Sequence, residues 1–522
     1  MDPKVLESAR AAFPTGSGAL TLGALLHGGE CNAEPTATLP LAMANRHGLI
    51  AGATGTGKTK TLQLLAEQFS AAGVPVFLAD LKGDLSGIAV AGEPNDRISQ
   101  RAKDTGYAWK GAGHPVEFLS LTGRGGAQLR ATVSSFGPLL LSRVLELNET
   151  QSSVLAMVFQ YCDDKKLPLL DLSDLRAALQ HLTGDGAAEL EAYGGMSKAS
   201  VGVLLREMVE LEQQGAGAFF GEPEFDLDDL TVVRDGQGLI SVLSLRDVQD
   251  KPALFSTFMM WMLARLYHEL PEVGDVDRPK LVFFFDEAHL LFDSASKAFL
   301  DQVEQVVRLI RSKGVGVWFV TQSPKDVPAD VLGQLGNRVQ HALRAFTPDD
   351  EKALRAAART FPKTDFYDVE EVLTTLGTGE AFVTVLAPNG APTPPFAVRM
   401  IPPGSRMGPL SEGELVSALS ASQQVAEYAQ AVDRDSAREM LARRMAPPES
   451  AAPAAPQGQA YPPIDQPDAG ARAAEVVGGA AAMVGAALNS PVGRQVARTL
   501  VSTVTRGLLG ALLGTPPRRR RR

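Results

Sequence analysis

The eight residues GATGTGKT, from Gly52 to Thr59, constrain this chain more than any other part of its sequence. They fit the pattern G-x-x-x-x-G-K-[ST], and they stand between an apolar run at residues 47–51 and an amphipathic stretch at 58–72 that contains no helix breaker. In such a strand–loop–helix unit the glycines let backbone N–H groups wrap around phosphate oxygens without Cβ clashes. The positive end of the following helix points at the same anion. The sequence therefore predicts a phosphate-binding loop; a chance match in a chain with 50 glycines would not explain this context.

The motif also predicts a separate role for each of its polar side chains. We expect Lys58 to neutralise the β- and γ-phosphates of ATP and the Thr59 hydroxyl to ligate Mg²⁺, which makes ATP and Mg²⁺ the expected cofactors. The residues expected to contact the nucleotide are Gly52, Ala53, Thr54, Gly55, Thr56, Gly57, Lys58, Thr59 and Lys60.

An acidic pair follows a second strongly apolar run. In LVFFFDEAH, five apolar residues directly precede Asp286 and Glu287, as in a strand buried on both sides. A carboxylate at the carboxyl end of a parallel strand faces the ligand crevice. We therefore expect Asp286 to hold Mg²⁺ and Glu287 to act as general base or orienter of the attacking water. A solvated acidic turn is the alternative.

Further polar residues are predicted near this pair. Gln322 ends the apolar run VWFVTQ and could sense the γ-phosphate, or it could only cap the strand. A charge-stabilising arginine is valuable in phosphoryl transfer and often comes from a neighbouring subunit. Arg311 is our first candidate and Arg338 our second, with a surface ion pair as the alternative for either. In ADLKGDLSG, the polar residues from Asp80 to Asp84 either face the crevice or form a solvated turn.

Predicted strands and helices alternate on both sides of a central interruption. Residues 47–80 suggest a strand–helix–strand unit, and alternation resumes at residue 238 and ends in a predicted hairpin at 379–402. This alternation predicts an α/β fold with a mainly parallel sheet covered on both faces. Residues 85–237 instead carry helical patterns separated by glycine-rich joints. We expect a P-loop ATPase core over 47–410 with a mainly helical insertion at about 85–237.

The remaining segments have different compositions. Residues 1–46 form a short N-terminal segment, and 411–444 are expected to be a C-terminal helical extension. Residues 445–470 are rich in Pro, Ala, Gln and Ser, which is typical of a disordered linker. Residues 471–522 combine an Ala/Gly-rich amphipathic segment with a terminal arginine run, Arg518–Arg522, and predict a flexible C-terminal tail.

Charge is distributed unevenly along the chain. Residues 441–522 carry 11 Lys and Arg against 4 Asp and Glu, whereas the whole chain has a net charge of −10, so the body is strongly acidic. An acidic body argues against a generally basic nucleic-acid-binding surface, while the tail could bind phosphate locally. Arg494 and Arg498 are four residues apart and would share one helix face. The tail could be a membrane-surface helix, a DNA contact or an element that packs on the protein itself.

Two features favour a reducing compartment. The first twenty residues lack a secretory signal pattern. The two cysteines, Cys31 and Cys162, lie far apart without metal-ligand spacing. We therefore expect a cytoplasmic protein in which neither thiol is catalytic.

The order of these motifs resembles the HerA/FtsK branch of hexameric ATPases, and more narrowly the bacterial HerA-like helicase group. The resemblance covers roughly residues 20–410 and is carried by NRHGLIAGATGTGKT, DLKGDLSG, GPLLLSRVLELNETQ, FFFDEAHLLF, IRSKGVGVWFVTQSP, NRVQHAL and RMIPPGSRMGP. It implies a RecA-like sheet, a homo-hexameric ring, Mg-ATP hydrolysis and translocation along DNA. It also implies that Arg311, in RSKG, is supplied to the adjacent subunit.

Two functions from different classes remain open on these grounds. The first is a ring-forming DNA translocase or helicase driven by ATP, which the motif order favours. The second is an ATP-dependent switch or remodeller that acts on a protein partner or a membrane surface, which the acidic body and the tail favour.

Overall fold

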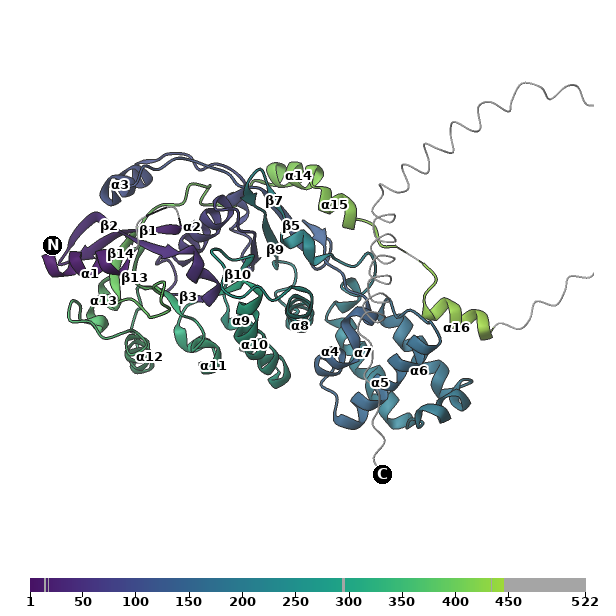
Figure 1. Ribbon diagram of the computed structural model, residues 1–522. Helices are drawn as coiled ribbons and strands as arrows, with labels where there is room; N and C mark the ends of the chain where they lie inside the picture. Colours follow the sequence, from purple (N-terminus) through teal and green to yellow (C-terminus); the bar gives the residue numbers. More distant parts are fainter. Residues whose placement is uncertain (14–15, 17, 293–295, 433, 446–522) are drawn as a thin grey trace, which may run out of the picture. The chain divides into compact units, whose positions relative to one another are not determined.

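A 12-stranded sheet runs through the protein, as seen in a computed structural model that describes residues 1–13, 16, 18–292, 296–432 and 434–445 (Figure 1). The described part of the chain belongs to one compact unit. The strands lie in the order β2-β1-β14-β13-β12-β3-β11-β10-β4-β9-β5-β6. Their bounds are Ala19–His27 (β1), Glu30–Pro40 (β2), Gly48–Ala51 (β3), Val76–Asp80 (β4), Val116–Ser120 (β5), Ala127–Gln128 (β6), Ile240–Ser244 (β9), Leu281–Phe285 (β10), Val315–Thr321 (β11), Asn337–His341 (β12), Glu380–Thr384 (β13) and Phe396–Met400 (β14). A separate small hairpin joins Val233–Arg234 (β7) to Gln237–Gly238 (β8).

Strands β12 to β6 in this order are parallel, whereas β13, β14, β1 and β2 extend the sheet in antiparallel fashion. Strand β3, which leads into the phosphate loop, lies between β11 and β12. Strand β10, which leads into the acidic pair, is separated from β3 by β11 alone. This arrangement confirms the expected RecA-like P-loop fold with a mainly parallel sheet.

Helices cover both faces of the sheet. Alternate residues of the central strands enter two different apolar cores, so that Phe283 belongs to one and Phe284 to the other. Helices α8 and α10 pack on the first face and helix α2 on the second, and Figure 1 shows α8 and α10 together on one side of the strands. The helices that contribute to this sheet domain are Pro3–Ala12 (α1), Lys58–Ala71 (α2), Asp96–Thr105 (α3), Pro252–Glu269 (α8), His289–Phe292 (α9), Lys297–Leu309 (α10), Ala329–Leu332 (α11), Pro348–Ala358 (α12), Val369–Thr375 (α13) and Glu412–Ala421 (α14).

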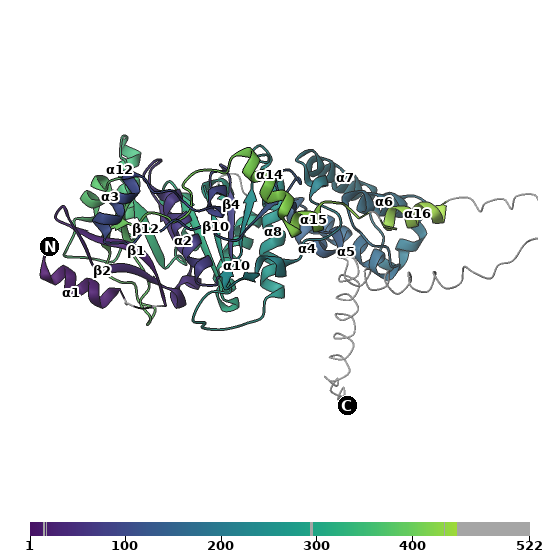
Figure 2. The same cartoon turned by 90° about the horizontal axis from the view of Figure 1, so that it is seen from above.

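The interruption expected between residues 85 and 237 is only partly helical. Helices Val133–Val144 (α4), Glu149–Asp164 (α5), Leu172–Thr183 (α6) and Lys198–Gln213 (α7) form a helical lobe (Figure 2). Strands β5 and β6, however, fall within the same range and join the main sheet beside β9. The helical insertion therefore begins only after β6. Strand β5 was missed because its short apolar run, residues 116–120, follows glycine-rich residues that suggest loop.

The N-terminal segment also differs from the expectation. Strands β1 and β2 form a hairpin, and β1 pairs with β14, so residues 19–40 complete the sheet instead of forming a segment separate from the core. The mixed composition of these residues hid the strands, because only one face of an outer hairpin needs to be apolar.

The segment after β14 connects the sheet domain to the helical lobe. Helices α14 and Gln423–Tyr428 (α15) follow the sheet, and Ala437–Met445 (α16) lies beside α6 (Figure 2). The backbone N–H of Ala437 donates to the carbonyl of Pro168, and Asp174 accepts from the N–H of Arg438 at 3.0 Å. In the described residues no helix is long and apolar enough to cross a membrane. The expected linker and tail at 446–522 lie outside the described residues.

Candidate active site

The predicted phosphate loop connects β3 to α2 at the carboxyl edge of the parallel strands. Its start is held by the neighbouring strands, since the Gly52 N–H donates to Thr321 in β11 and the Ala53 N–H donates to Ala342 just after β12. No side chain caps the start of α2 at Gly57. An uncapped helix N-terminus whose loop is fixed on both sides is a ready anion-binding site.

Two of the loop glycines are required by their surroundings. Gly52 has φ +153°, and a Cβ there would lie 2.6 Å from the Cβ of His341. Gly57 has φ +118°, and a Cβ there would lie 3.2 Å from the Cα of Gly379. A larger residue at either position would have to displace the neighbouring chain as well as adopt an unfavourable backbone conformation.

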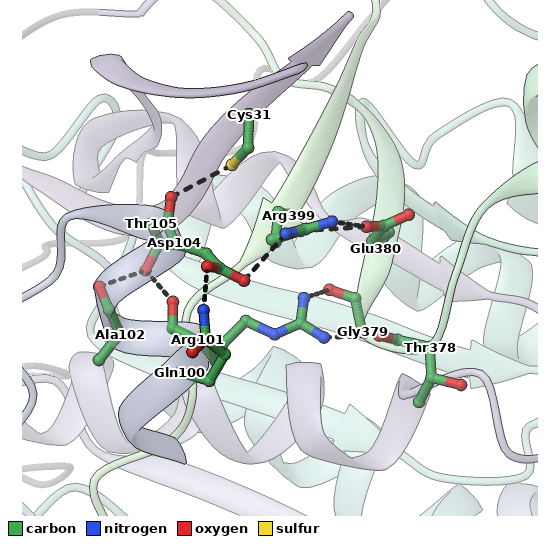
Figure 3. A network of polar contacts seen from close by, with 10 residues as sticks. All are labelled: Cys31, Gln100, Arg101, Ala102, Asp104, Thr105, Thr378, Gly379, Glu380 and Arg399. Carbon is green, nitrogen blue, oxygen red and sulfur yellow. Dashed lines mark hydrogen bonds and ion pairs between the residues drawn. The ribbon is translucent and has the colours of Figure 1, made fainter. Parts of the chain in front are cut away.

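A network of hydrogen bonds and ion pairs links the loop to helix α3 (Figure 3). The Gly379 N–H donates to the carbonyl of Thr56 in the loop at 2.8 Å. Arg101 of α3 in turn donates to the carbonyls of Gly379 and Thr378, at 3.2 and 2.8 Å. Close by, Arg399 bridges Asp104 of α3 and Glu380 of β13. Helix α3 is therefore linked to the phosphate loop through a short, fully hydrogen-bonded turn.

His341 contacts both the helix that follows the loop and strand β13. Its ring lies between Thr61 of α2, whose Oγ1 is 2.8 Å from Nε2, and the carbonyl of Glu380, 2.8 Å from Nδ1. A carbonyl can only accept, so Nδ1 carries the proton and Nε2 accepts from the threonine hydroxyl. Complete burial lowers the pKa of His341 to about 4 and keeps the ring neutral.

Lys58 and Thr59 lie at the start of α2, as expected. The Lys58 ammonium donates to the carbonyl of Ala53 at 3.2 Å and has no carboxylate in direct contact among the described residues. Burial lowers the pKa of Lys58, and the charges of Glu287 and Asp286 compensate its charge only in part. A phosphate group would supply that compensation.

The acidic pair stands at the carboxyl end of β10, where it shares this edge with the loop. Asp286 and Glu287 are 8% and 5% exposed. One oxygen of Asp286 accepts from the Glu287 N–H at 3.0 Å, whereas Oδ2 is buried without a hydrogen-bond partner among the described residues. Burial, together with the charge of Glu287, raises the pKa of Asp286 to about 7. A buried, unpartnered carboxylate oxygen costs free energy unless a cation or proton meets it.

These donors fit Mg²⁺. The ion usually binds proteins through one or two carboxylates, with phosphate and water oxygens completing its shell. Asp286 offers the unpartnered oxygen, and the Thr59 hydroxyl belongs to the same edge of the sheet. The described residues contain no group of three or more His, Cys, Asp or Glu that could hold a metal without the nucleotide.

Glu287 is held by a lysine that follows the neighbouring strand. Its Oε1 forms an ion pair with Lys82, and its Oε2 lies 3.3 Å from Nδ1 of His289. Burial by itself raises the pKa of Glu287, but the hydrogen bond and charge of Lys82 outweigh it, so the pKa is lowered. Glu287 also has φ +50°, a left-handed conformation uncommon outside glycine and concentrated at functional sites.

Gln322 lies on the same edge. It lines a cleft of about 350 Å³ together with Ala53 of the phosphate loop and His289. The structure thus places Gln322 beside the loop and beside His289, which itself contacts Glu287. The neighbouring Thr321 hydroxyl donates to Asp326 at 2.7 Å, which fixes the turn after β11.

The two arginine candidates lie away from this edge of their own chain. Arg311 belongs to a 3-10 helix, Ile310–Lys313, just before β11 and therefore at the amino edge of the parallel strands. It is 42% exposed and 3.4 Å from Asp275. Arg338 is largely buried near the start of β12, where it donates to the carbonyls of Leu332, Leu335 and Thr360. Arg311 is thus accessible to another molecule, whereas the hydrogen bonds of Arg338 join segments of its own chain.

A second cleft, of about 370 Å³, opens on the other side of the loop. Its polar wall carries Lys60, Arg97 and Arg101 and no acidic side chain, and its apolar floor is formed by residues 400–403 and Met407. Gly57 and Thr61 also line it, so it is continuous with the start of α2. Its dimensions and apolar floor suit a nucleoside.

Sequence reasoning missed His341 and Arg101 as supports of the loop. Neither has a local signal, because each acts through a residue that is distant in sequence. Lys82 carried a signal, since its segment directly follows the second parallel strand, but the sequence left a solvated turn equally open.

The chain resembles known helicases over most of its length. A family model described as Helicase HerA-like C-terminal matches residues 27–521. The curated relatives include a probable helicase of Methanocaldococcus jannaschii, 29% identical over 28% of this chain and 28% of that protein. They also include the DNA double-strand break repair helicase HerA of Sulfolobus acidocaldarius, 21% identical over 65% of this chain and 62% of that protein. The chain thus spans less than two thirds of either relative.

Two solved structures follow a similar course of the chain at low sequence identity. The bacterial conjugative coupling protein TrwB in an unbound form is 15% identical, with a TM-score of 0.49, over 78% of this chain and 94% of that one. VirB4 of Thermoanaerobacter pseudethanolicus is 15% identical, with a TM-score of 0.45, over 74% of this chain and 97% of that one.

Proposed function

This chain belongs to the family described as Helicase HerA-like C-terminal, and on that premise we propose that it is an ATP-hydrolysing ring motor that translocates along DNA. The observation that carries the proposal is the convergence of the phosphate loop, Asp286–Glu287 and Gln322 at one edge of the parallel sheet. A P-loop ATPase needs these parts together, because phosphoryl transfer is achieved by positioning and charge stabilisation.

Each residue then has a task in hydrolysis. The N–H groups of the loop and Lys58 bind the phosphates, and the cleft beside α3 takes the base and ribose. Thr59 and Asp286 hold Mg²⁺, which when bound neutralises charge on the phosphates. Glu287 orients and deprotonates the attacking water, and Gln322 contacts the γ-phosphate.

Assembly and DNA binding are the finer parts of the proposal. The Sulfolobus relative is named as a DNA repair helicase, which supports DNA as the track. Arg311 is exposed and lies away from its own loop, which supports a role at the loop of an adjacent copy in a homo-hexamer. In such a ring each nucleotide would lie between two protomers.

Steady-state ATP hydrolysis with and without single- and double-stranded DNA tests the proposal, at low and moderate salt. Wild type should hydrolyse ATP with a rate that DNA raises, and Glu287→Gln should reduce kcat by at least a hundredfold. Glu210→Gln is the matched control, because Glu210 is an exposed glutamate of α7 in the helical lobe. Light scattering with a non-hydrolysable ATP analogue should report a hexamer.

The outcomes separate the two functions considered from the sequence. Hydrolysis that depends on Glu287 and rises with DNA supports the DNA motor. Hydrolysis that depends on Glu287 but ignores DNA replaces the motor with a switch that acts on a protein or membrane surface. Hydrolysis that survives Glu287→Gln refutes the assignment of the site.

A further inference from the structure

Lys82 occupies the carboxylate that hydrolysis requires. Its ammonium forms an ion pair with Oε1 of Glu287, a residue whose side chain is only 6% exposed. The other oxygen, Oε2, makes no hydrogen bond to a described residue, but it lies 3.3 Å from Nδ1 of His289. A carboxylate that orients and deprotonates water must present an oxygen to that water. In this arrangement the ammonium competes with the water for the same group.

Hydrogen bonds hold the backbone around Lys82, although its side chain is 48% exposed. After β4, Asp80 accepts from the N–H groups of Gly83 and Leu85, at 2.7 and 3.1 Å, which closes a tight turn. The carbonyl of Leu81 accepts from the side chain of Gln249 at 2.7 Å. The turn therefore aims Lys82 at Glu287 while leaving its four-carbon stem free to move.

The charges of the site change when a phosphate enters. Among the described residues, the charges of Asp286 and Glu287 act on both Lys58 and Lys82, and the charge of Asp84 also acts on Lys82. A phosphate oxyanion nearby would compete with Glu287 for the ammonium of Lys82. Because the Lys82 side chain is 48% exposed, its ammonium can turn toward solvent without displacing a buried neighbour.

We propose that Lys82 is a positioning residue that holds Glu287 in the resting protein and exchanges it for a phosphate oxyanion when the enzyme is active. This inference rests on the proposed ATPase function, in which Glu287 serves the attacking water. The phosphate has two sources, the γ-phosphate of ATP and the backbone of a DNA strand passing the turn. Either source would release Glu287 only when a productive ligand is present.

The test uses the full chain with Lys82→Ala, Lys82→Arg and a matched control, Lys165→Ala. Lys165 is also a partly exposed lysine paired with a glutamate, 41% exposed and 3.2 Å from Glu189, but it follows α5 in the helical lobe. Two quantities are measured for each protein. The first is kcat without and with duplex DNA, and the second is the ratio of affinities for a non-hydrolysable ATP analogue and for ADP, by calorimetry.

Each source predicts a different result for Lys82→Ala. If the γ-phosphate releases Glu287, the preference for the ATP analogue over ADP falls at least fivefold and the stimulation by DNA is unchanged. If DNA releases Glu287, kcat measured without DNA rises at least threefold. The ratio of kcat with DNA to kcat without DNA then falls toward one, and the ratio of affinities for the ATP analogue and ADP is unchanged. Lys82→Arg restores wild-type values in both cases, because it keeps the cation.

Other outcomes refute the inference without refuting the ATPase. If Lys82→Ala matches Lys165→Ala in both quantities, or lowers kcat without changing either ratio, Lys82 has no such exchange. Failure of the proposed function looks different, since wild type would then not hydrolyse ATP or would not need Glu287. In that event the affinity ratio alone decides, and an unchanged ratio refutes the inference.

Discussion

Acidification should weaken this fold through His341 in a way that can be calculated. The ring is completely buried and neutral, with a pKa of about 4 in the folded protein, against roughly 6.5 for an exposed histidine. Between these values the unfolded chain binds more protons, so stability rises with pH across this window. The stabilisation is complete above about pH 7 and is lost progressively as the pH falls from about 6.5 to about 4.

The size of the effect follows from the two pKa values. At pH 5 the unfolded histidine is almost fully protonated and the folded one almost neutral, which costs about 2 kcal/mol of unfolding free energy. His47 is also fully buried with a pKa of about 4, and it adds a similar amount. The two histidines together should lower the stability by about 4 kcal/mol between pH 8 and pH 5.

His341→Asn isolates the contribution of one ring. Its amide can still donate toward the carbonyl of Glu380, but it does not titrate. Urea unfolding at pH 8 and pH 5 should show a loss of stability that is smaller in the variant than in wild type by about 2 kcal/mol. The reasoning is refuted if both proteins lose the same free energy over this range, because His341 would then be free to protonate in the folded state.

Three further changes test other parts of the site. Lys58→Ala should weaken ATP binding by about tenfold to a hundredfold, since it removes a charge-assisted contact to phosphate, and calorimetry would show this; unchanged affinity would exclude the lysine from the site. Gly52→Ala should lower the free energy of unfolding by about 1–3 kcal/mol in urea unfolding, because its Cβ would lie 2.6 Å from that of His341. An unchanged free energy would mean that β12 can shift to make room for the methyl group. Asn337→Ala should cost about 2–4 kcal/mol in the same assay, because the side chain donates to the carbonyls of Met43 and His47 and accepts from Leu386; a loss below about 1 kcal/mol would contradict this.

Local patterns predicted which edge of the sheet carries the phosphate loop and the acidic pair. The phosphate loop and Asp286–Glu287 could be placed from sequence, because each combines an apolar strand with the polar residues that directly follow it. In parallel strands such residues meet at one edge whatever the rest of the chain does. The mainly parallel sheet followed from the same alternation of apolar runs and amphipathic stretches.

The parts that sequence did not predict depend on contacts between distant segments. Strand β1 is recognisable only once β14 is beside it, 370 or more residues later in the chain. Arg101 matters because its carbonyl partners at 378–379 also hold the loop. Arg338 illustrates the converse, since a charge that suggested catalysis in the sequence is satisfied by three carbonyls of its own chain. No local pattern carries this information.

The C-terminal helices have a mechanical consequence. The helical lobe leaves the sheet after β6 and returns before β9, and its helix α4 also packs on helices α8 and α10 of the sheet domain. Helix α16, which packs on α6, and Tyr428 of α15, whose hydroxyl donates to Asp229 at 2.7 Å, add two further attachments. Because packing and the C-terminal segment hold the lobe in addition to its two connecting chains, we expect the lobe to move together with the sheet.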